Sequence, residues 1–169
     1  RNQIILLLIF GSGLKVSNLS ELKEEHLFIK EGNRVLIDSN NKRDPYTVPL
    51  TPIFSTVYKR YKTLLEKKKS EFNLQFPEVL FNANPYRILS GGLSPRGLEL
   101  ILQDFREKLI IEITPKSLRQ ACIFKWLHQK KKDSQIKEWL GVAPSYSLSQ
   151  YKDLLTKHIY NEDFLEELY

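Results

Sequence analysis

The sequence predicts an α+β fold that is mostly helical: a helical bundle with a small three-stranded antiparallel sheet near the N-terminal third. Apolar residues recur at helical spacing in several long segments, which favours helices. Three short runs between residues 26 and 50 have instead the composition of strands and are separated by turn residues. A length of 169 residues suits one domain that can bury a substantial core.

The first segment, residues 2–10, is expected to form a buried helix. Gly11-Ser12-Gly13 should end it, because glycine adopts positive φ without steric cost. A second, short helix should follow, with Ser17 as its N-terminal cap. Lys15 would then lie in the turn between these two helices.

The predicted sheet consists of HLFIK, RVLID and YTVPL, at residues 26–30, 34–38 and 46–50. Glu31-Gly32-Asn33 joins the first two runs, and Gly or Asn in such a turn is typical of a hairpin with positive φ. A polar turn that contains Lys42 joins the second run to the third.

Two long helices are expected next. Thr51-Pro52 should start a helix that continues to Lys69, and six lysine and arginine side chains crowd its polar face. Its expected apolar positions are Ile53, Val57, Tyr61, Leu64 and Leu65. Residues 70–92 are interpreted as a polar connection, and Ser94-Pro95 should open a helix that runs to Lys108.

The stretch from residue 114 to residue 151 organises the rest of the chain. Thr114-Pro115 is a helix start, because proline is favoured at the first helical position. The apolar face of this helix contains Cys122, and Arg119 lies off that face. Asp133 or Ser134 should cap a second helix, which Gly141 ends, and Tyr151 should lie on a third.

This stretch resembles the C-terminal half of the tyrosine recombinase catalytic domain, as found in phage integrases and Xer-like proteins. The family pattern is His-x-x-Arg at the start of a helix, then Leu-Gly-His, then a tyrosine nine positions beyond that histidine. Here the same frame reads Lys116-x-x-Arg119, Leu140-Gly141-Val142 and Tyr151. Residues 6–23 also resemble the helix–GTGLRxSEL–helix segment of the family. The resemblance therefore covers essentially the whole chain and implies one catalytic domain, residues 1–169, excised from a longer protein.

The resemblance implies a DNA recombination and integration reaction, in which a tyrosine attacks a DNA phosphate and forms a 3′-phosphotyrosine intermediate. It assigns the nucleophile to Tyr151 and the phosphate-binding cations to Arg119, Lys116 and Lys15. The family has a lysine in this hairpin tip that protonates the leaving 5′ oxygen; the strict position here is Asn41, and Lys42, one residue further on, would serve in its place unless it is simply a solvated turn lysine. The family chemistry uses cationic side chains to stabilise the transition state, so it implies no metal and no cofactor.

Departures from the family pattern predict weak cleavage. Lys15 replaces an arginine, and a lysine cannot grip two phosphate oxygens as a guanidinium does. Val142 replaces a histidine or tryptophan and offers no donor. Tyr146 and Tyr160 are further tyrosines, but only Tyr151 has the family spacing. The alternatives to an active recombinase are a catalytically inactive DNA-binding module and a protein-interaction module.

Composition is compatible with these interpretations. The net charge of +6 favours an anionic partner, for which duplex DNA is the usual choice. One cysteine, Cys122, allows no internal disulfide and fits a reducing compartment, so we expect a cytoplasmic protein. The longest apolar run is too short to span a membrane. Residues 161–169 are acidic and amphipathic, and they are expected either to mediate self-association on DNA or to pack on their own domain.

Overall fold

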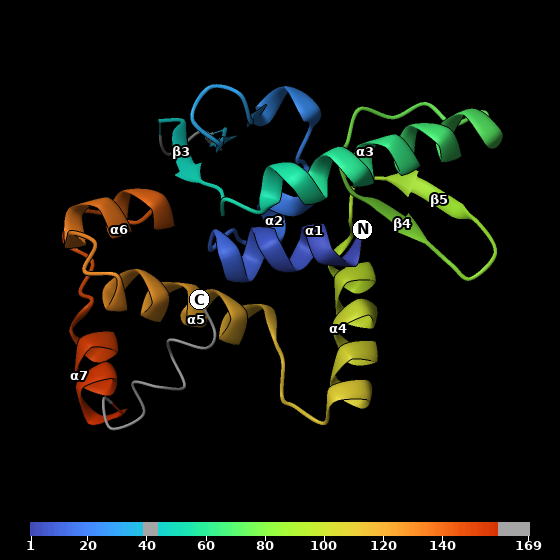
Figure 1. Ribbon diagram of the computed structural model, residues 1–169. Helices are drawn as coiled ribbons and strands as arrows, with labels where there is room; N and C mark the ends of the chain where they lie inside the picture. The colour runs from blue at the N-terminus through green and yellow to red at the C-terminus, as the bar shows by residue number, and fades with distance from the viewer. Residues whose placement is uncertain (39–43, 159–169) are drawn as a thin grey trace.

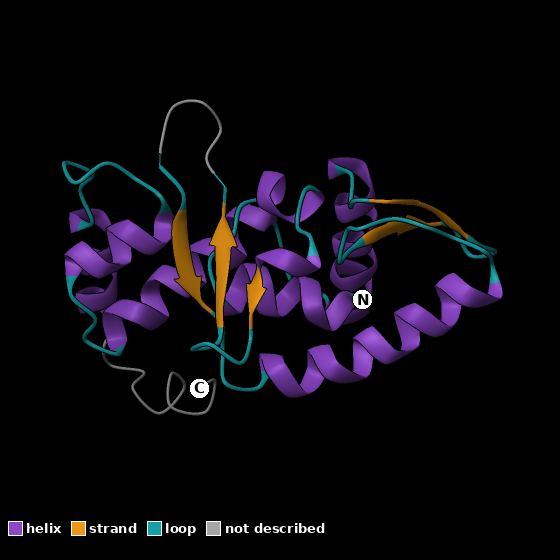
Figure 2. Cartoon of the chain, turned by 90° about the horizontal axis from the view of Figure 1, so that it is seen from above, coloured by secondary structure: helices purple, strands orange, loops and turns teal. Residues whose placement is uncertain are grey.

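The computed structural model describes residues 1–38 and 44–158, and it confirms the α+β class. In Figure 1, α5 (Pro115–His128) runs beside η1 (Leu7–Gly11), which continues α1 (Asn2–Leu6), and α4 (Pro95–Leu109) lies near the N-terminal end of α1. The strands of the larger sheet stand next to one another in the order β1 (Leu27–Phe28), β2 (Arg34–Ile37) and β3 (Tyr46–Pro49) (Figure 2). Among the described helices, none combines the length and the apolar character that a membrane span requires.

The buried N-terminal helix changes from α-helical to π-helical geometry along its length. α1 passes without a break into η1, a π-helical segment at Leu7–Gly11. Gly13 then adopts φ +66°, and the place of its missing Cβ lies 3.1 Å from the indole ring of Trp126. A side chain at this position would press on that ring, so glycine lets the turn after η1 pack closely against α5.

The sequence predicted Ser17 as the cap of helix α2 (Val16–Ser20), but the helix begins at Val16 and its capping position is Lys15. The side-chain oxygen of Asn18 accepts a hydrogen bond of 3.1 Å from the backbone N–H of Lys15. This bond satisfies an N–H that the helix itself cannot satisfy, and it fixes Lys15 at the exit of the turn. The short helix η2 (Glu24–His26) then leads into the sheet.

The three-stranded antiparallel sheet confirms the sequence prediction. Val35 pairs with both Leu27 and Val48, which sets the register of all three strands. Gly32 and Asn33 adopt φ values of +101° and +52° in the first hairpin turn, which is the conformation that these two residues favour. Val35, Ile37 and Val48 point into the core.

Helix α3 (Phe54–Glu71) starts three residues later than Thr51, and its buried face differs from the predicted one. Ile53 and Leu64 are 58% and 64% exposed. The face that packs on the core instead contains Phe54, Tyr58, Tyr61 and Leu65. The Tyr61 hydroxyl donates to the carbonyl of Val79 over 2.5 Å and so ties this helix to the following connection.

The predicted connection of residues 70–92 contains a second antiparallel hairpin, β4 (Phe81–Ala83) with β5 (Ile88–Gly91). The side chain of Asn82 accepts from both the N–H and the hydroxyl of Ser94. Ser94 is also the N-terminal cap of α4, since its hydroxyl accepts from the N–H of Gly97. This hairpin therefore fixes the start of α4, which begins where the sequence predicts.

The remaining helices follow the predicted order. Thr114 caps α5 with its hydroxyl, which accepts from the N–H of Ser117 over 3.0 Å. α6 (Asp133–Leu140) is preceded by Lys132, so Asp133 is its first helical residue rather than its cap. Gly141 ends α6 with φ +63°, as predicted, and α7 (Ser149–His158) packs against α5.

Candidate active site

Arg119 lies in the second turn of α5 and reaches toward the end of α6. Its Nη2 donates a hydrogen bond of 2.7 Å to the carbonyl oxygen of Leu140, one of the last carbonyls of that helix. None of the described carboxylates forms an ion pair with it. Burial lowers the pKa of Arg119, and nearby tyrosine and cysteine groups oppose this effect. The guanidinium remains charged, because an arginine pKa starts far above neutrality.

Tyr151 lies in the first turn of α7 and is only 8% exposed. Its ring meets the edge of Phe124, from α5, at a centroid distance of 5.6 Å in a T-shaped arrangement. Burial raises the pKa of the Tyr151 hydroxyl, and the hydrogen bond to Tyr146 adds to this effect. Gln120 and Arg119 lower the same pKa, so both act on the phenol from α5.

The structure therefore brings Arg119 and Tyr151 into one cluster at the junction of α5, α6 and α7. This cluster is the candidate active site. It contains a guanidinium that is fixed by one hydrogen bond and a phenol whose ring is held by an aromatic contact. Such a pair can bind an anionic group and present an oxygen nucleophile to it.

Two further tyrosines belong to this cluster, and sequence reasoning missed their place in it. The hydroxyl of Tyr146, from the loop before α7, lies 3.4 Å from that of Tyr151. Tyr46, the first residue of β3, acts on the Arg119 pKa and packs its ring against Gly141. The spacing of five residues between Tyr146 and Tyr151 was visible in the sequence, but nothing in the sequence pointed to Tyr46.

The other predicted site residues occupy different positions. Lys116 is exposed in the first turn of α5, one turn before Arg119. Lys15 is exposed at the start of α2. The turn that precedes it lies against α5, because Gly13 in that turn packs closely on Cys122 and Trp126. Lys42 lies outside the described residues, as do Tyr160 and the acidic segment 161–169.

Val142 cannot supply the hydrogen-bond donor that the family pattern has at this position. Its side chain is half-buried and packs against the hydrophobic core, and its backbone N–H donates to the carbonyl of Lys137 over 3.1 Å. Cys122 is fully buried, as predicted, and burial raises the pKa of its thiol to about 12. It is therefore a core residue, although it lies one turn from Arg119.

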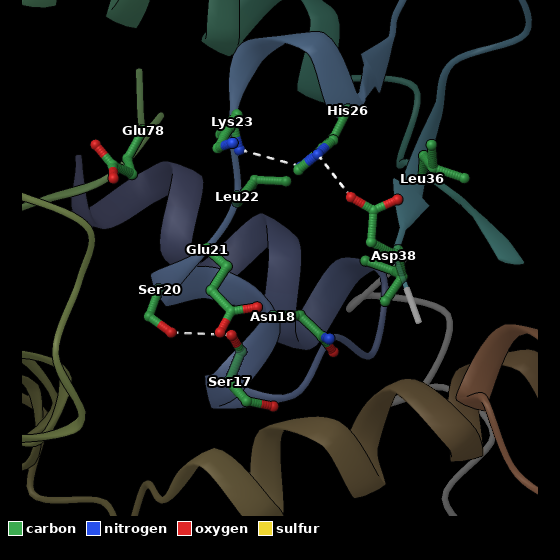
Figure 3. A pocket seen from close by; sticks show the side chains of 11 residues that line it. Ser17, Asn18, Ser20, Glu21, Leu22, Lys23, His26, Leu36, Asp38 and Glu78 are labelled. Atoms are coloured by element: carbon green, nitrogen blue, oxygen red, sulfur yellow. Dashed lines mark hydrogen bonds and ion pairs between the residues drawn. The ribbon is translucent and has the colours of Figure 1, made fainter. Parts of the chain in front are cut away.

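A cavity of about 330 Å³ lies beside α2 but does not belong to this site. Figure 3 shows His26 between two partners: its Nδ1 accepts from the N–H of Lys23, and its Nε2 lies 3.1 Å from the carboxylate of Asp38. Glu21 and Glu78 also line the cavity. The carboxylates of Glu21, Asp38 and Glu78 would repel a phosphate in this cavity. The contact of His26 with Asp38 instead holds the end of β2.

Many basic side chains outside the cluster form ion pairs within the domain. In α3, Lys62 pairs with Glu24, and Lys69 pairs with Glu66. In α4, Arg106 pairs with Glu99 over 2.5 Å. These basic side chains are paired with carboxylates of the same domain, which does not favour a phosphate-binding role for them. Among the described residues, no three His, Cys, Asp or Glu side chains are grouped as a metal site requires.

Comparison with known proteins gives relatives over nearly the whole chain, although no protein-family profile matches it. The tyrosine recombinases XerA of Pyrococcus furiosus and Pyrococcus horikoshii are 28% and 26% identical over 159 residues, which is 94% of this chain. That alignment covers 52% of each relative. The chain thus spans about half the length of the curated relatives that it matches.

Solved structures share the fold. The crystal structure of XerA recombinase has a TM-score of 0.65 and 17% identity over 92% of this chain and 57% of that one. The Tn1549 transposon integrase in complex with circular intermediate DNA has a TM-score of 0.55 and 11% identity over 89% of this chain and 52% of its own. In sequence this chain is therefore similar to the XerA tyrosine recombinases, and in fold it is similar to the solved XerA and Tn1549 integrase structures.

Proposed function

We propose that this domain binds duplex DNA and breaks and rejoins a DNA strand through a covalent link at Tyr151, at a reduced rate. In this proposal residues 1–169 act as the catalytic domain of a longer recombinase. The observation that supports it most directly is the clustering of Arg119 with Tyr151. The similarity to XerA recombinases and the DNA bound in the Tn1549 integrase structure give further support.

The proposed reaction follows from the chemistry of these groups. Tyr151 is the nucleophile: its oxygen forms a bond to phosphorus while the bond from phosphorus to the leaving 5′ oxygen breaks. Arg119 binds the non-bridging oxygens, on which negative charge develops, and a planar guanidinium suits this geometry. Its hydrogen bond to the Leu140 carbonyl orients it for this role. Lys116 and Lys15 add positive charge, and Lys42 is proposed to protonate the leaving oxygen.

We propose a reduced rate because the chain departs from the family pattern at two positions, Lys15 and Val142. Removal of one donor of this kind costs roughly 10²–10³ in rate. Lys15 provides one point charge where the family has a bidentate group, and Val142 provides no donor at all. If the two losses are independent, the rate falls by about four to six orders of magnitude. The second candidate function, DNA binding without cleavage, rests on these same two positions.

DNA binding itself is proposed from charge. The chain has 26 lysine and arginine residues against 20 aspartate and glutamate residues. Several of these cations are paired internally, so we propose that the contact with phosphate centres on Lys15, Lys116 and Arg119. Self-association on DNA through residues 161–169 remains a proposal, because this segment lies outside the described residues.

The experiment is a suicide-substrate assay, in which a nicked duplex traps the covalent adduct. Because the target sequence is not known, the substrate is a pool of nicked duplexes of random sequence, and adducts are detected by gel shift after denaturation. The control variant Tyr151→Phe retains the ring that contacts Phe124 and removes only the nucleophilic oxygen. We expect a trace of adduct with the native chain and none with the variant. Salt-dependent duplex binding without any adduct would instead establish the binding module.

A further inference from the structure

Two phenol oxygens meet in the candidate site. The hydroxyls of Tyr146 and Tyr151 lie 3.4 Å apart, at the outer limit of a hydrogen bond. Tyr146 is held by a turn in which its backbone N–H donates to the carbonyl of Ala143 over 2.9 Å. Tyr151 is held by its edge contact with Phe124. The turn holds the backbone of Tyr146, and its ring packs against the hydrophobic core, so the two hydroxyls face each other.

The two phenols differ in their access to water. Tyr151 is buried, whereas Tyr146 is partly exposed. A proton that leaves the Tyr151 oxygen therefore has a path to solvent through the hydroxyl of Tyr146. A hydroxyl suits this task, because it can accept one proton and release its own at the same time.

The other groups that face Tyr151 do not suit this task. Arg119 and Gln120 approach from α5; a guanidinium has no acceptor, and an amide that accepted the proton at its oxygen could release one only from its nitrogen, which would leave the unfavourable imidic acid form. On α7 itself, the neighbouring Lys152 is bound to Asp133 of α6 over 2.7 Å. Of these neighbours, Tyr146 alone can accept a proton and release another at the same atom, and so return to its starting form.

We infer that Tyr146 relays the proton of Tyr151 to solvent when Tyr151 attacks a phosphate. This inference rests on the proposed function and adds a residue to its mechanism. As the bond from the Tyr151 oxygen to phosphorus forms, its proton passes to the Tyr146 oxygen, and the proton of Tyr146 passes to water. The bond from phosphorus to the 5′ oxygen breaks, and that oxygen takes a proton from its own donor. Protons and electron pairs therefore balance, and Tyr146 ends neutral.

Tyr151 carries a proton at neutral pH, so its attack on a phosphate has to release one. Burial and the contact with Tyr146 raise the pKa of the Tyr151 hydroxyl above its ordinary value, which already lies well above neutrality. The nucleophile is therefore protonated at neutral pH. In Tyr146→Phe the contribution of the neighbouring hydroxyl is lost, so the pKa of Tyr151 should fall, while burial still keeps the phenol protonated at pH 7.

The test compares Tyr146→Phe with Tyr58→Phe, a matched control that removes the hydroxyl of a buried tyrosine in α3. Tyrosine labelled at Cζ with ¹³C reports the titration of each phenol by NMR, and Tyr151→Phe assigns the Tyr151 signal. The second measurement is the rate of covalent adduct formation on the nicked duplex pool between pH 6 and pH 10.

In Tyr146→Phe we expect the Tyr151 titration to move to lower pH and the adduct rate at pH 7 to fall about 10²-fold, the scale of proton-transfer catalysis. The loss should shrink as the pH rises, because a phenolate needs no relay. Tyr58→Phe should change neither. If the Tyr151 titration is unchanged in Tyr146→Phe, the two hydroxyls do not interact as inferred. If the adduct rate of Tyr146→Phe equals that of Tyr58→Phe, the relay is refuted. A shifted titration without adduct in the native chain would support the pair but overturn the proposed function.

Discussion

Gly141 connects the packing of the domain to the candidate site, and its replacement by alanine gives a sharp prediction. It ends α6 with φ +63°, directly after Leu140, whose carbonyl binds Arg119. A Cβ at this position would lie 2.3 Å from the hydroxyl of Tyr46 and 2.5 Å from the ring carbon that bears it. Real Cβ atoms do not approach other atoms so closely, so Tyr46 has to move in the Gly141→Ala variant.

Gly32 offers a matched control that separates two causes of instability. It also has positive φ, +101°, but a Cβ there meets no atom nearer than 3.8 Å. Gly32→Ala should therefore cost only the left-handed backbone penalty, about 1–2 kcal/mol. Gly141→Ala should cost this penalty and a further 1–3 kcal/mol or so for overpacking against Tyr46.

Urea unfolding of both variants measures these free energies. A double-mutant cycle with Tyr46→Ala should recover the overpacking cost, because the smaller side chain makes room for the new Cβ. Gly141→Ala should also lower the yield of the Tyr151 adduct, since Tyr46 and the end of α6 must move apart and the Leu140 carbonyl at that end orients Arg119. The reasoning is refuted if Gly141→Ala is no less stable than Gly32→Ala and the cycle shows no coupling.

Two other predictions concern the site and the core. The double variant Lys15→Arg with Val142→His should raise adduct formation by about 10²-fold or more, because each change restores one donor; no rise in the suicide-substrate assay would show that the pocket cannot place them. The thiol of Cys122 is buried and its pKa is raised to about 12, so it should resist iodoacetamide at pH 8 in the folded chain and react rapidly in urea. Equal rates of alkylation, measured by mass spectrometry, would contradict this burial.

The elements that could be predicted from the sequence are those with strong local signals. Thr114-Pro115 and Ser94-Pro95 start helices at their expected places, because capping involves only neighbouring residues. Gly32-Asn33 turns the first hairpin for the same reason. The helix predicted from Thr51 starts instead at Phe54, and its buried face follows the contacts of the folded core rather than its own spacing.

The candidate site shows the same division. The sequence pattern identified Arg119 and Tyr151 by spacing, and it showed directly that Val142 and Lys15 depart from the family. It could not show that Tyr46 packs beside Gly141, since these residues lie far apart in the chain and meet only when β3 contacts α6. It also could not show whether Tyr146 points toward Tyr151 or toward solvent, because a loop has no periodicity to reveal this.

The sequence by itself thus determined the class of fold, the position of most helices and strands, and the two residues on which the proposed chemistry depends. The fold class and the elements follow from caps, turns and periodic patterns, which act over a few residues, whereas Arg119 and Tyr151 follow from the resemblance to the tyrosine recombinase pattern. Only the tertiary structure decided which phenols surround Arg119 and how deeply Tyr151 is buried. Those properties depend on contacts between α5, α6, α7 and β3, and such contacts exist only once the chain has folded.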